Sequence, residues 1–194
     1  IIGGVGGIGS WVTFFLARIG HSLHIYDMDV IDTTNMGGQL YKESHVGTLK
    51  TEAIAEICKE FSGKDVTIFL NSTYDKDSQT APIVFSCFDN MSARKIMFEK
   101  WAESDSRELF IDGRLLAEVG MVFTVQKGQE EAYRKELFDD SEVDEVDCSF
   151  KATSHAGAYI GSIMTNSLNS YLSNKALNFD GREIPFRRDF VFPT

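Results

Sequence analysis

Cysteine is scarce in this chain. The 194 residues include only Cys58, Cys87 and Cys148, an odd number of cysteines that lie far apart in the sequence. Such spacing does not form a disulfide framework, and no Cys-x-x-Cys pair is present to hold a structural zinc ion. We therefore expect a protein of a reducing compartment, namely the cytoplasm.

Long apolar runs and an excess of positive charge are lacking as well. No apolar run reaches the length of about 18 residues that a membrane span needs, and no signal peptide is visible, so we expect no membrane association. The formal net charge is −10, whereas a nucleic-acid-binding surface needs basic residues, so nucleic acid is not expected as the main partner. The composition, with 43% hydrophobic and 25% charged residues, is typical of one globular domain with a full core.

A glycine-rich turn follows the first apolar residues. Its spacing, Gly4-x-Gly6-x-x-Gly9, is typical of a loop that lets backbone N–H groups approach a phosphate. Gly4 permits a tight turn, Gly6 leaves room for the ligand, and Gly9 lets the next helix pack close to the strand. We expect Gly7 to belong to the same loop, at the positive end of a helix that starts near Ser10. The loop alone is compatible with NAD, FAD or ATP.

Strand-like and helix-like segments alternate along most of the chain. The first strand has two apolar residues before the glycines, where about five are usual, so we expect further residues upstream of Ile1. The periodicity predicts helices over residues 10–19, 50–61 and 93–102, and strands over 22–27, 66–71, 83–88, 109–112 and 120–126. This alternation predicts an α/β fold, Rossmann-like and doubly wound, in which helices cover both faces of a mostly parallel sheet.

Beyond residue 126 the composition changes. Residues 127–157 are highly charged, include a run of acidic residues, and are expected to form a crossover loop, either solvated or facing a basic partner. A helix is predicted from about residue 158 to 172, followed by a terminal hairpin or arm. We therefore expect residues 1–194 to form a single domain, with a nucleotide-binding core over 1–126 and a C-terminal helix and arm over 158–194.

Polar residues follow the predicted strands at the edge where ligands bind in an open parallel sheet. Asp27 lies 18 residues after Gly9, the usual place for an acid that holds a ribose, although it could also cap a turn. Asp29 has two similar interpretations, a nucleotide contact or a turn former. The segment Asp112-Gly113-Arg114 is expected at the same edge.

Asp89 and Lys50 distinguish between the candidate nucleotides. Asp89 is a second carboxylate at a strand end, beside Asn90, and is a natural Mg²⁺ ligand, although an Asp before a helix is also a common N-cap. Lys50 begins a helix that should reach the same edge, where its charge suits phosphoryl or nucleotidyl transfer; the alternative is a solvated lysine. These residues favour ATP with Mg²⁺ over a nicotinamide cofactor.

Five motifs, taken in order, resemble the ThiF/MoeB/HesA family, the adenylyltransferases related to ubiquitin-activating enzymes. They are the glycine loop over residues 4–10, the segment from Tyr26 to Gln39, residues 46–53, residues 86–90, and Arg94. The resemblance is ordered through about residue 126 and is weak over residues 148–172.

The resemblance implies that ATP and Mg²⁺ are the cofactors and that the partner is a ubiquitin-like or sulfur-carrier protein, whose C-terminal carboxylate becomes an acyl-adenylate. It also implies a homodimer. The residues that it places around the nucleotide are Asp27 on the ribose, Asn35 and Lys50 on the phosphates, and Asp89 on the metal with Asn90 beside it. Gln39 is expected to bind the nucleotide as well. Cys148 lies where several members carry a cysteine that accepts the acyl group as a thioester, unless it is an inert buried thiol.

One position departs from the family. The family usually has Asn-x-x-Arg-Gln with the arginine on the phosphates, and here Gly38 stands in place of the arginine. Arg94, Arg114 or an arginine of a partner subunit could substitute, although Arg94 could equally form a salt bridge on the helix surface. Asn35 could be only a turn former. Two alternatives to an adenylating enzyme stay open, namely a catalytically impaired binding subunit and an NAD(P)-dependent oxidoreductase.

Overall fold

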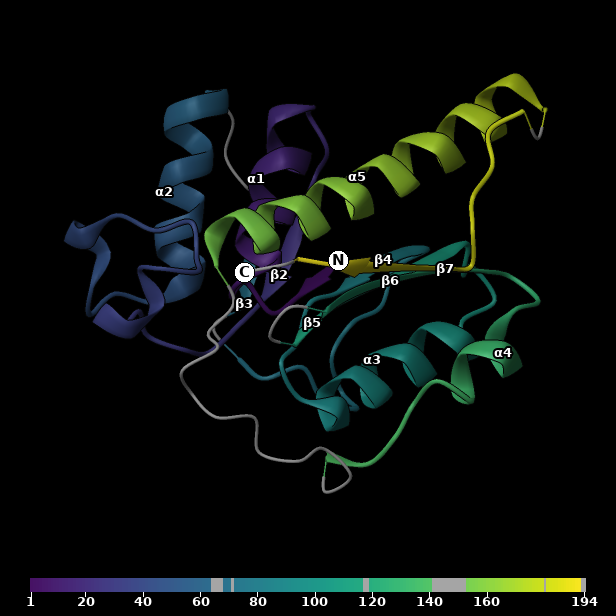
Figure 1. The fold of residues 1–194 in the computed structure, drawn as a ribbon, viewed down its shortest axis with the longest axis horizontal. Helices are drawn as coiled ribbons and strands as arrows, with labels where there is room; N and C mark the ends of the chain where they lie inside the picture. The colour runs from purple at the N-terminus through teal and green to yellow at the C-terminus, as the bar shows by residue number, and fades with distance from the viewer. Residues whose placement is uncertain (64–67, 71, 117–118, 141–152, 180, 193–194) are drawn as a thin grey trace.

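The computed structural model describes residues 1–63, 68–70, 72–116, 119–140, 153–179 and 181–192. Its centre is a seven-stranded sheet with the strand order β3-β2-β1-β4-β5-β6-β7 (Figure 1). The strands are β1 (Ile2–Gly3), β2 (His24–Tyr26), β3 (Ile68–Leu70), β4 (Ile83–Ser86), β5 (Leu109–Leu116), β6 (Val119–Gln126) and β7 (Arg187–Val191). The first five strands pair in parallel, whereas β6 and β7 pair antiparallel, which confirms the prediction of a mostly parallel sheet.

The order of the strands reverses beside β1. The chain moves from β1 outward to β2 and β3, and then returns to place β4 on the other side of β1. Such a reversal is a topological switch point, where the carboxyl ends of the strands leave a crevice for a ligand. This rule predicts the ligand site where β1 passes into the glycine loop.

Helices cover both faces of the sheet, as predicted. One face carries α1 (Gly9–Arg18), α2 (Lys50–Ser62) and α5 (Ser154–Leu177), and the other carries α3 (Met91–Glu103) and α4 (Glu130–Arg134) (Figure 1). Two short 3-10 helices, η1 (Thr33–Asn35) and η2 (Glu43–His45), lie between β2 and α2. Within the described residues, no helix combines the length and the apolar character that a membrane span requires.

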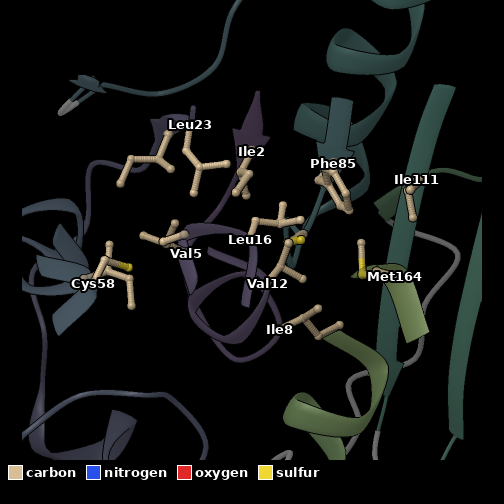
Figure 2. Close-up of a cluster of buried hydrophobic side chains, with 14 of the residues drawn as sticks. Ile2, Val5, Ile8, Val12, Leu16, Leu23, Cys58, Phe85, Ile111 and Met164 are labelled. Carbon is tan, nitrogen blue, oxygen red and sulfur yellow. The ribbon is translucent and has the colours of Figure 1, made fainter. Parts of the chain in front are cut away.

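A separate apolar core fills each face. Figure 2 shows the core on the α1 side, where Ile2 and Phe85 of the sheet pack near Val12 of α1. The core on the α3 side is mostly aromatic and includes Phe98. Val84 belongs to this second core although its neighbour Phe85 belongs to the first, because successive side chains of a strand point to opposite faces. This arrangement explains the nearly continuous apolar sequence of β4.

The C-terminal part differs from the prediction in three places. β5 continues to Leu116 instead of ending at residue 112. The predicted crossover loop contains α4 and the first residues of α5, which begins at Ser154 and ends at Leu177. The described residues of the tail form no hairpin of their own, because β7 pairs with β6 and becomes the edge of the sheet. The acidic residues 141–147 and Cys148 lie outside the described residues.

Two glycines let α5 pack directly on the glycine loop and on α1. A Cβ atom on Gly157 would collide with the carbonyl oxygen of Gly7, and one on Gly161 would lie 3.2 Å from the Cβ atom of Trp11. Glycine in a helix interior is usually destabilising. Here the absence of a side chain permits the helix to contact the backbone of the loop.

Gly157→Ala is expected to lower the free energy of unfolding by about 1–3 kcal/mol, because the added methyl group must displace the loop. The better helix propensity of alanine offsets at most about 1 kcal/mol of this loss. Urea unfolding measures the difference. Gly37→Ala is the matched control, since a Cβ atom on Gly37 would meet nothing within 4 Å. A Gly157→Ala protein more stable than the control would show that α5 does not contact the loop.

Candidate functional site

The glycine loop joins β1 to α1 through close backbone contacts. Gly4 has a φ angle of +79°, and a Cβ atom there would lie 2.9 Å from the carbonyl oxygen of Cys87, which follows β4. A Cβ atom on Gly9 would collide with the carbonyl oxygen of Gly4. These contacts account for the tight turn and for the close approach of helix and strand that the spacing predicts.

The other two glycines of the loop face open space. Within 4 Å, a Cβ atom on Gly6 would meet only the side-chain nitrogen of Gln39 among the described atoms, at 3.9 Å, and one on Gly7 only the carbonyl oxygen of Gly38, at 4.0 Å. The segment that contains Gly38 and Gln39 therefore lies opposite the loop. A phosphate between the two stays a prediction.

Asp27 follows β2 and caps the glycine loop. Its Oδ2 accepts a hydrogen bond from the N–H of Val5 (2.8 Å), and its Oδ1 accepts one from the N–H of Asp29 (2.9 Å). Burial raises the pKa of Asp27, and the two backbone hydrogen bonds and the charge of Lys50 oppose that rise. The capping interpretation is confirmed, and the ribose contact stays a prediction.

Lys50 lies at the first position of α2 and faces Asp29. Its Nζ is 2.6 Å from Asp29 Oδ2, and its backbone N–H donates to the carbonyl oxygen of Asp29 (2.9 Å). The lysine is only 7% exposed, so the interpretation as a solvated lysine at a helix end is wrong. The pair brings one ammonium group to the carboxyl end of β2. Its contact with a phosphate stays a prediction.

Asn35 closes the turn of η1. Its Oδ1 accepts a hydrogen bond from the N–H of Asp32 (2.9 Å), while Asp32 Oδ1 accepts one from the N–H of Thr34 (2.8 Å). This reciprocal capping stabilises the start of a helical turn. The turn-forming interpretation of Asn35 is confirmed, and its contact with a phosphate stays a prediction.

Asp89 and Asn90 follow β4, and the structure gives them different tasks. Asn90 is the N-cap of α3, because its Oδ1 accepts a hydrogen bond from the N–H of Ala93 (2.8 Å). The interpretation of Asp89 as the cap is therefore wrong. Asp89 is exposed beside the cap, with Oδ1 3.4 Å from the side-chain nitrogen of Asn90. Its carboxylate thus faces solvent at the carboxyl end of β4.

Asp140 is a residue of this region that sequence analysis missed. Its carboxylate accepts hydrogen bonds from the N–H of Met91 (2.5 Å), the N–H of Ser92 (3.1 Å) and the hydroxyl of Ser92 (2.6 Å). The hydroxyl of Ser92 and the N–H of Met91 lower the pKa of Asp140. The charged segment after α4 is thereby attached to the first turn of α3, directly after Asp89. Only its place in a run of acids is visible in the sequence.

The segment Asp112-Gly113-Arg114 begins level with the carboxyl end of β4, since Asp112 pairs with Ser86, but its charged side chains are directed into the core. Asp112 and Arg114 are both buried on the α3 side of β5, and Arg114 Nε donates to Asp112 Oδ2 (2.7 Å). The hydroxyl of Tyr133 donates to the same oxygen (2.8 Å). The charges of Asp112 and Arg114 compensate each other inside the core. β5 therefore continues through these residues, although the sequence suggests that the strand ends at residue 112.

Arg94 lies in the same buried network. It is 4% exposed and forms an ion pair with Asp112, so the surface salt-bridge interpretation is wrong. Its guanidinium donates to the carbonyl oxygens of Phe88 and Gly113, which joins the residue before Asp89 to β5. Burial lowers the pKa of Arg94 to about 10. Neither Arg94 nor Arg114 stands in the place of the family arginine opposite the glycine loop.

The two described cysteines are unsuited to nucleophilic chemistry. Cys58 and Cys87 are buried, and burial raises the pKa of each thiol to about 12. Both thiols therefore stay protonated near neutral pH, and a nucleophile must be a thiolate. The predicted acceptor, Cys148, lies outside the described residues.

Several of the predicted site residues meet at the switch point, whereas Arg94 lies in the buried network on the α3 side. The glycine loop, Asp27, the Lys50–Asp29 pair and Asp89 occupy the carboxyl ends of β1, β2 and β4. A cavity of about 610 Å³ lies at the opposite edge, lined by residues that include His24, Ile83 and Leu172, and contains none of the predicted site residues.

The donor set fits Mg²⁺ together with a nucleotide. Protein sites usually hold Mg²⁺ through one or two carboxylates, with phosphate oxygens and water as the other ligands. Asp89 supplies one exposed carboxylate at the switch point. Among the described residues, no cluster of three or more His, Cys, Asp or Glu could hold a metal ion alone.

The ThiF family model matches residues 1–188. The chain belongs to the ThiF family. Ubiquitin-like modifier-activating enzyme 5 of rice (Oryza sativa subsp. japonica) is 28% identical over 139 residues, which are 58% of this chain and 33% of that protein. The tRNA threonylcarbamoyladenosine dehydratase of Haemophilus influenzae is 48% identical over 58 residues, which are 29% of this chain and 22% of that protein. This ThiF chain thus spans a third or less of the curated relatives it matches.

Solved structures of ThiF-type proteins share the fold. The dehydratase TcdA of E. coli in complex with ATP has a TM-score of 0.68 at 19% identity, covering 91% of this chain and 86% of that chain. E. coli MccB with MccA-N7isoASN has a TM-score of 0.74 at 16% identity, covering 99% of this chain and 64% of that chain. At such identities the likeness shows the Rossmann-like fold.

Asp112→Asn is expected to lower the free energy of unfolding by about 3–5 kcal/mol, because it leaves the guanidinium groups of Arg94 and Arg114 buried without a countercharge. Denaturant unfolding measures the loss. Glu99→Gln is the control, since its ion pair with Arg134 lies at the surface and should contribute less than about 1 kcal/mol. Equal losses in the two variants would show that the buried network is not what holds β5 and α3 together.

Proposed function

We propose that this ThiF protein uses ATP and Mg²⁺ to adenylate a carboxylate. The observation that carries the proposal is the meeting of four features at one switch point: the glycine loop, Asp27, the Lys50–Asp29 pair and the exposed Asp89. A dinucleotide oxidoreductase needs the first two features but has little use for the others. Membership of the ThiF family supports the same assignment.

Each site residue has a proposed role toward the nucleotide. Asp27 and Asp29 contact the ribose side, and the glycine loop with Asn35 and Gln39 surrounds the phosphates. Asp89, with Asn90 beside it, holds Mg²⁺, which neutralises phosphate charge when it is bound. Lys50 adds a second positive charge from the start of α2. Arg94 does not touch the nucleotide but donates to the carbonyl oxygen of Phe88 and so positions the neighbouring Asp89.

The proposed reaction forms one bond and breaks one. A carboxylate oxygen of the partner attacks the α-phosphorus of ATP, the bond to the β-phosphate oxygen breaks, and pyrophosphate leaves with its electron pair. The products are an acyl-adenylate and pyrophosphate. The protein contributes position and charge, since no proton has to move for the attack.

The proposed partner is the C-terminal tail of a ubiquitin-like or sulfur-carrier protein. The relative named ubiquitin-like modifier-activating enzyme 5 and the MccB–MccA structure motivate this choice. Cys148 is proposed as the acceptor: its thiolate attacks the acyl carbon of the adenylate, the bond to the AMP oxygen breaks and AMP leaves, which forms a thioester. Hydroxylamine or a reducing thiol would release this thioester from a trapped complex. We further propose a cytoplasmic homodimer, with residues 1–126 as nucleotide-binding core, 127–157 as crossover and 158–194 as C-terminal helix and arm.

A second candidate is an ATP-dependent reaction on tRNA. The short but close match to the Haemophilus dehydratase favours it. The net charge of −10 opposes it, because a surface that binds tRNA needs positive charge. If tRNA rather than a carrier protein stimulates ATP–pyrophosphate exchange, this second candidate replaces the first.

ATP with Mg²⁺ is expected to raise the melting temperature, whereas NAD⁺ and NADPH are not. A ligand at about 100 times its Kd stabilises a protein by about 2.7 kcal/mol, which a thermal melt detects. Asp89→Asn should lose the part of the shift that depends on Mg²⁺. Asp105→Asn, exposed beyond the end of α3, should keep it. A shift with NAD⁺ alone would instead support an oxidoreductase, and no shift with any nucleotide would support a binding subunit.

Gly38→Arg is expected to increase ATP–pyrophosphate exchange, because it adds a guanidinium to the segment whose carbonyl oxygen lies opposite Gly7, where the phosphates are proposed to bind. The assay uses carrier proteins with a free C-terminal carboxylate, and the same carriers with an amidated C-terminus as blanks. Gly37→Arg, one residue earlier, is the control for added charge. Exchange that is already rapid in the natural protein and unchanged in Gly38→Arg would show that no arginine is needed there.

A further inference from the structure

Tyr41 connects the segment opposite the glycine loop to the loop itself. Its buried phenol donates a hydrogen bond to the carbonyl oxygen of Val5 (2.5 Å), and the carbonyl oxygen of Lys50 lies 3.5 Å from the same hydroxyl. Burial is the main cause that raises the pKa of Tyr41 well above its usual value, so the phenol keeps its proton and stays a donor. One side chain thus contacts both the turn and the start of α2.

Val5 is held on both sides of its backbone. Asp27 accepts the hydrogen bond of the Val5 N–H, and Tyr41 donates to the Val5 carbonyl oxygen. The Asp27 contact holds the peptide unit that joins Gly4 to Val5, and the Tyr41 contact sets the orientation of the unit that follows, which joins Val5 to Gly6. In a planar trans peptide the C=O and N–H bonds point in opposite directions. A carbonyl directed inward to Tyr41 therefore directs the Gly6 N–H outward.

The outward direction is the one that a phosphate requires. A Cβ atom on Gly6 would meet only the side-chain nitrogen of Gln39 among the described atoms within 4 Å. Backbone N–H groups ahead of a helix bind anions when they point at the ligand. The neighbour of Tyr41 also attaches this segment to the start of α1, since the N–H of Leu40 donates to the hydroxyl of Ser10 (3.1 Å).

We propose that Tyr41 is a positioning residue for phosphate binding, which orients the Gly6 N–H by holding the carbonyl group of Val5. The inference rests on the proposed nucleotide binding and adds to it a residue that touches no substrate. It predicts selectivity by chemical group: the phosphates of a nucleotide depend on Tyr41, and the nucleoside portion does not.

Tyr41→Phe tests the inference, because it removes one hydroxyl and keeps the ring. Calorimetry would give the Kd values of ATP, ADP, AMP and adenosine in the presence of Mg²⁺. The three nucleotides are expected to bind about tenfold more weakly, the effect of losing one buried hydrogen bond, while adenosine binds as before. Tyr171→Phe is the matched control, since its hydroxyl donates to Glu108 at the amino edge of the sheet (3.1 Å) and should change none of the four values.

The outcomes distinguish the positioning role of Tyr41 from the proposed nucleotide binding itself. Equal weakening of adenosine and ATP would mean a general structural role and would overturn the inference, as would unchanged ATP binding in Tyr41→Phe. If the natural protein binds none of the four ligands, the proposed function itself fails. The NMR signal of the Gly6 amide is a second readout that needs no ligand: it should shift in Tyr41→Phe and not in Tyr171→Phe, and an unchanged signal overturns the inference.

Discussion

Direct contact between backbones at the glycine loop is the constraint on which the other elements of the site depend. The carbonyl oxygen of Gly4 occupies the place that a side chain on residue 9 would need, and Gly157 of α5 meets the carbonyl oxygen of Gly7 in the same way. With no side chain between them, β1, α1 and α5 approach as closely as their main chains allow. The loop is thereby held by α1 and by α5, and its remaining side faces residues 38 and 39.

Two sets of polar contacts hold the ends of the strands that flank this loop. On the α1 side, the carboxylate of Asp27 accepts from Val5 and so joins the end of β2 to the turn. On the α3 side, Arg94 holds the carbonyl oxygen of Phe88 and pairs with Asp112, which is fully buried. The positions of Asp27 and Asp89, the two acids proposed to contact the nucleotide, are therefore fixed by contacts on different faces of the sheet. Such rigid placement suits a reaction that depends on position and charge.

The distribution of positive charge distinguishes this chain from the usual family pattern. Arg94 and Arg114 are directed into the core, and Gly38 replaces the arginine of the family motif. Lys50, paired with Asp29, is a cation that the structure brings to the carboxyl end of β2. Charge at the proposed phosphate position then comes from Lys50, from the start of α1 and from a bound metal ion, in a chain whose net charge is −10.

Local features of the sequence determined much of the fold and part of the site. The glycine spacing required a tight turn before a helix, the apolar run at β4 required burial on both faces, and the acids after β2 and β4 had to lie at one edge of a parallel sheet. These inferences hold because they depend on backbone geometry and on periodicity within a few residues. The tertiary structure alone decided which buried charges compensate each other, as Asp112 and Arg114 do inside β5. It also decided that the Asp140 carboxylate accepts hydrogen bonds from the first turn of α3 and that Tyr41 reaches Val5 across 36 positions of sequence. Contacts of that range leave no periodic pattern in the chain, because they arise only when separate elements pack together.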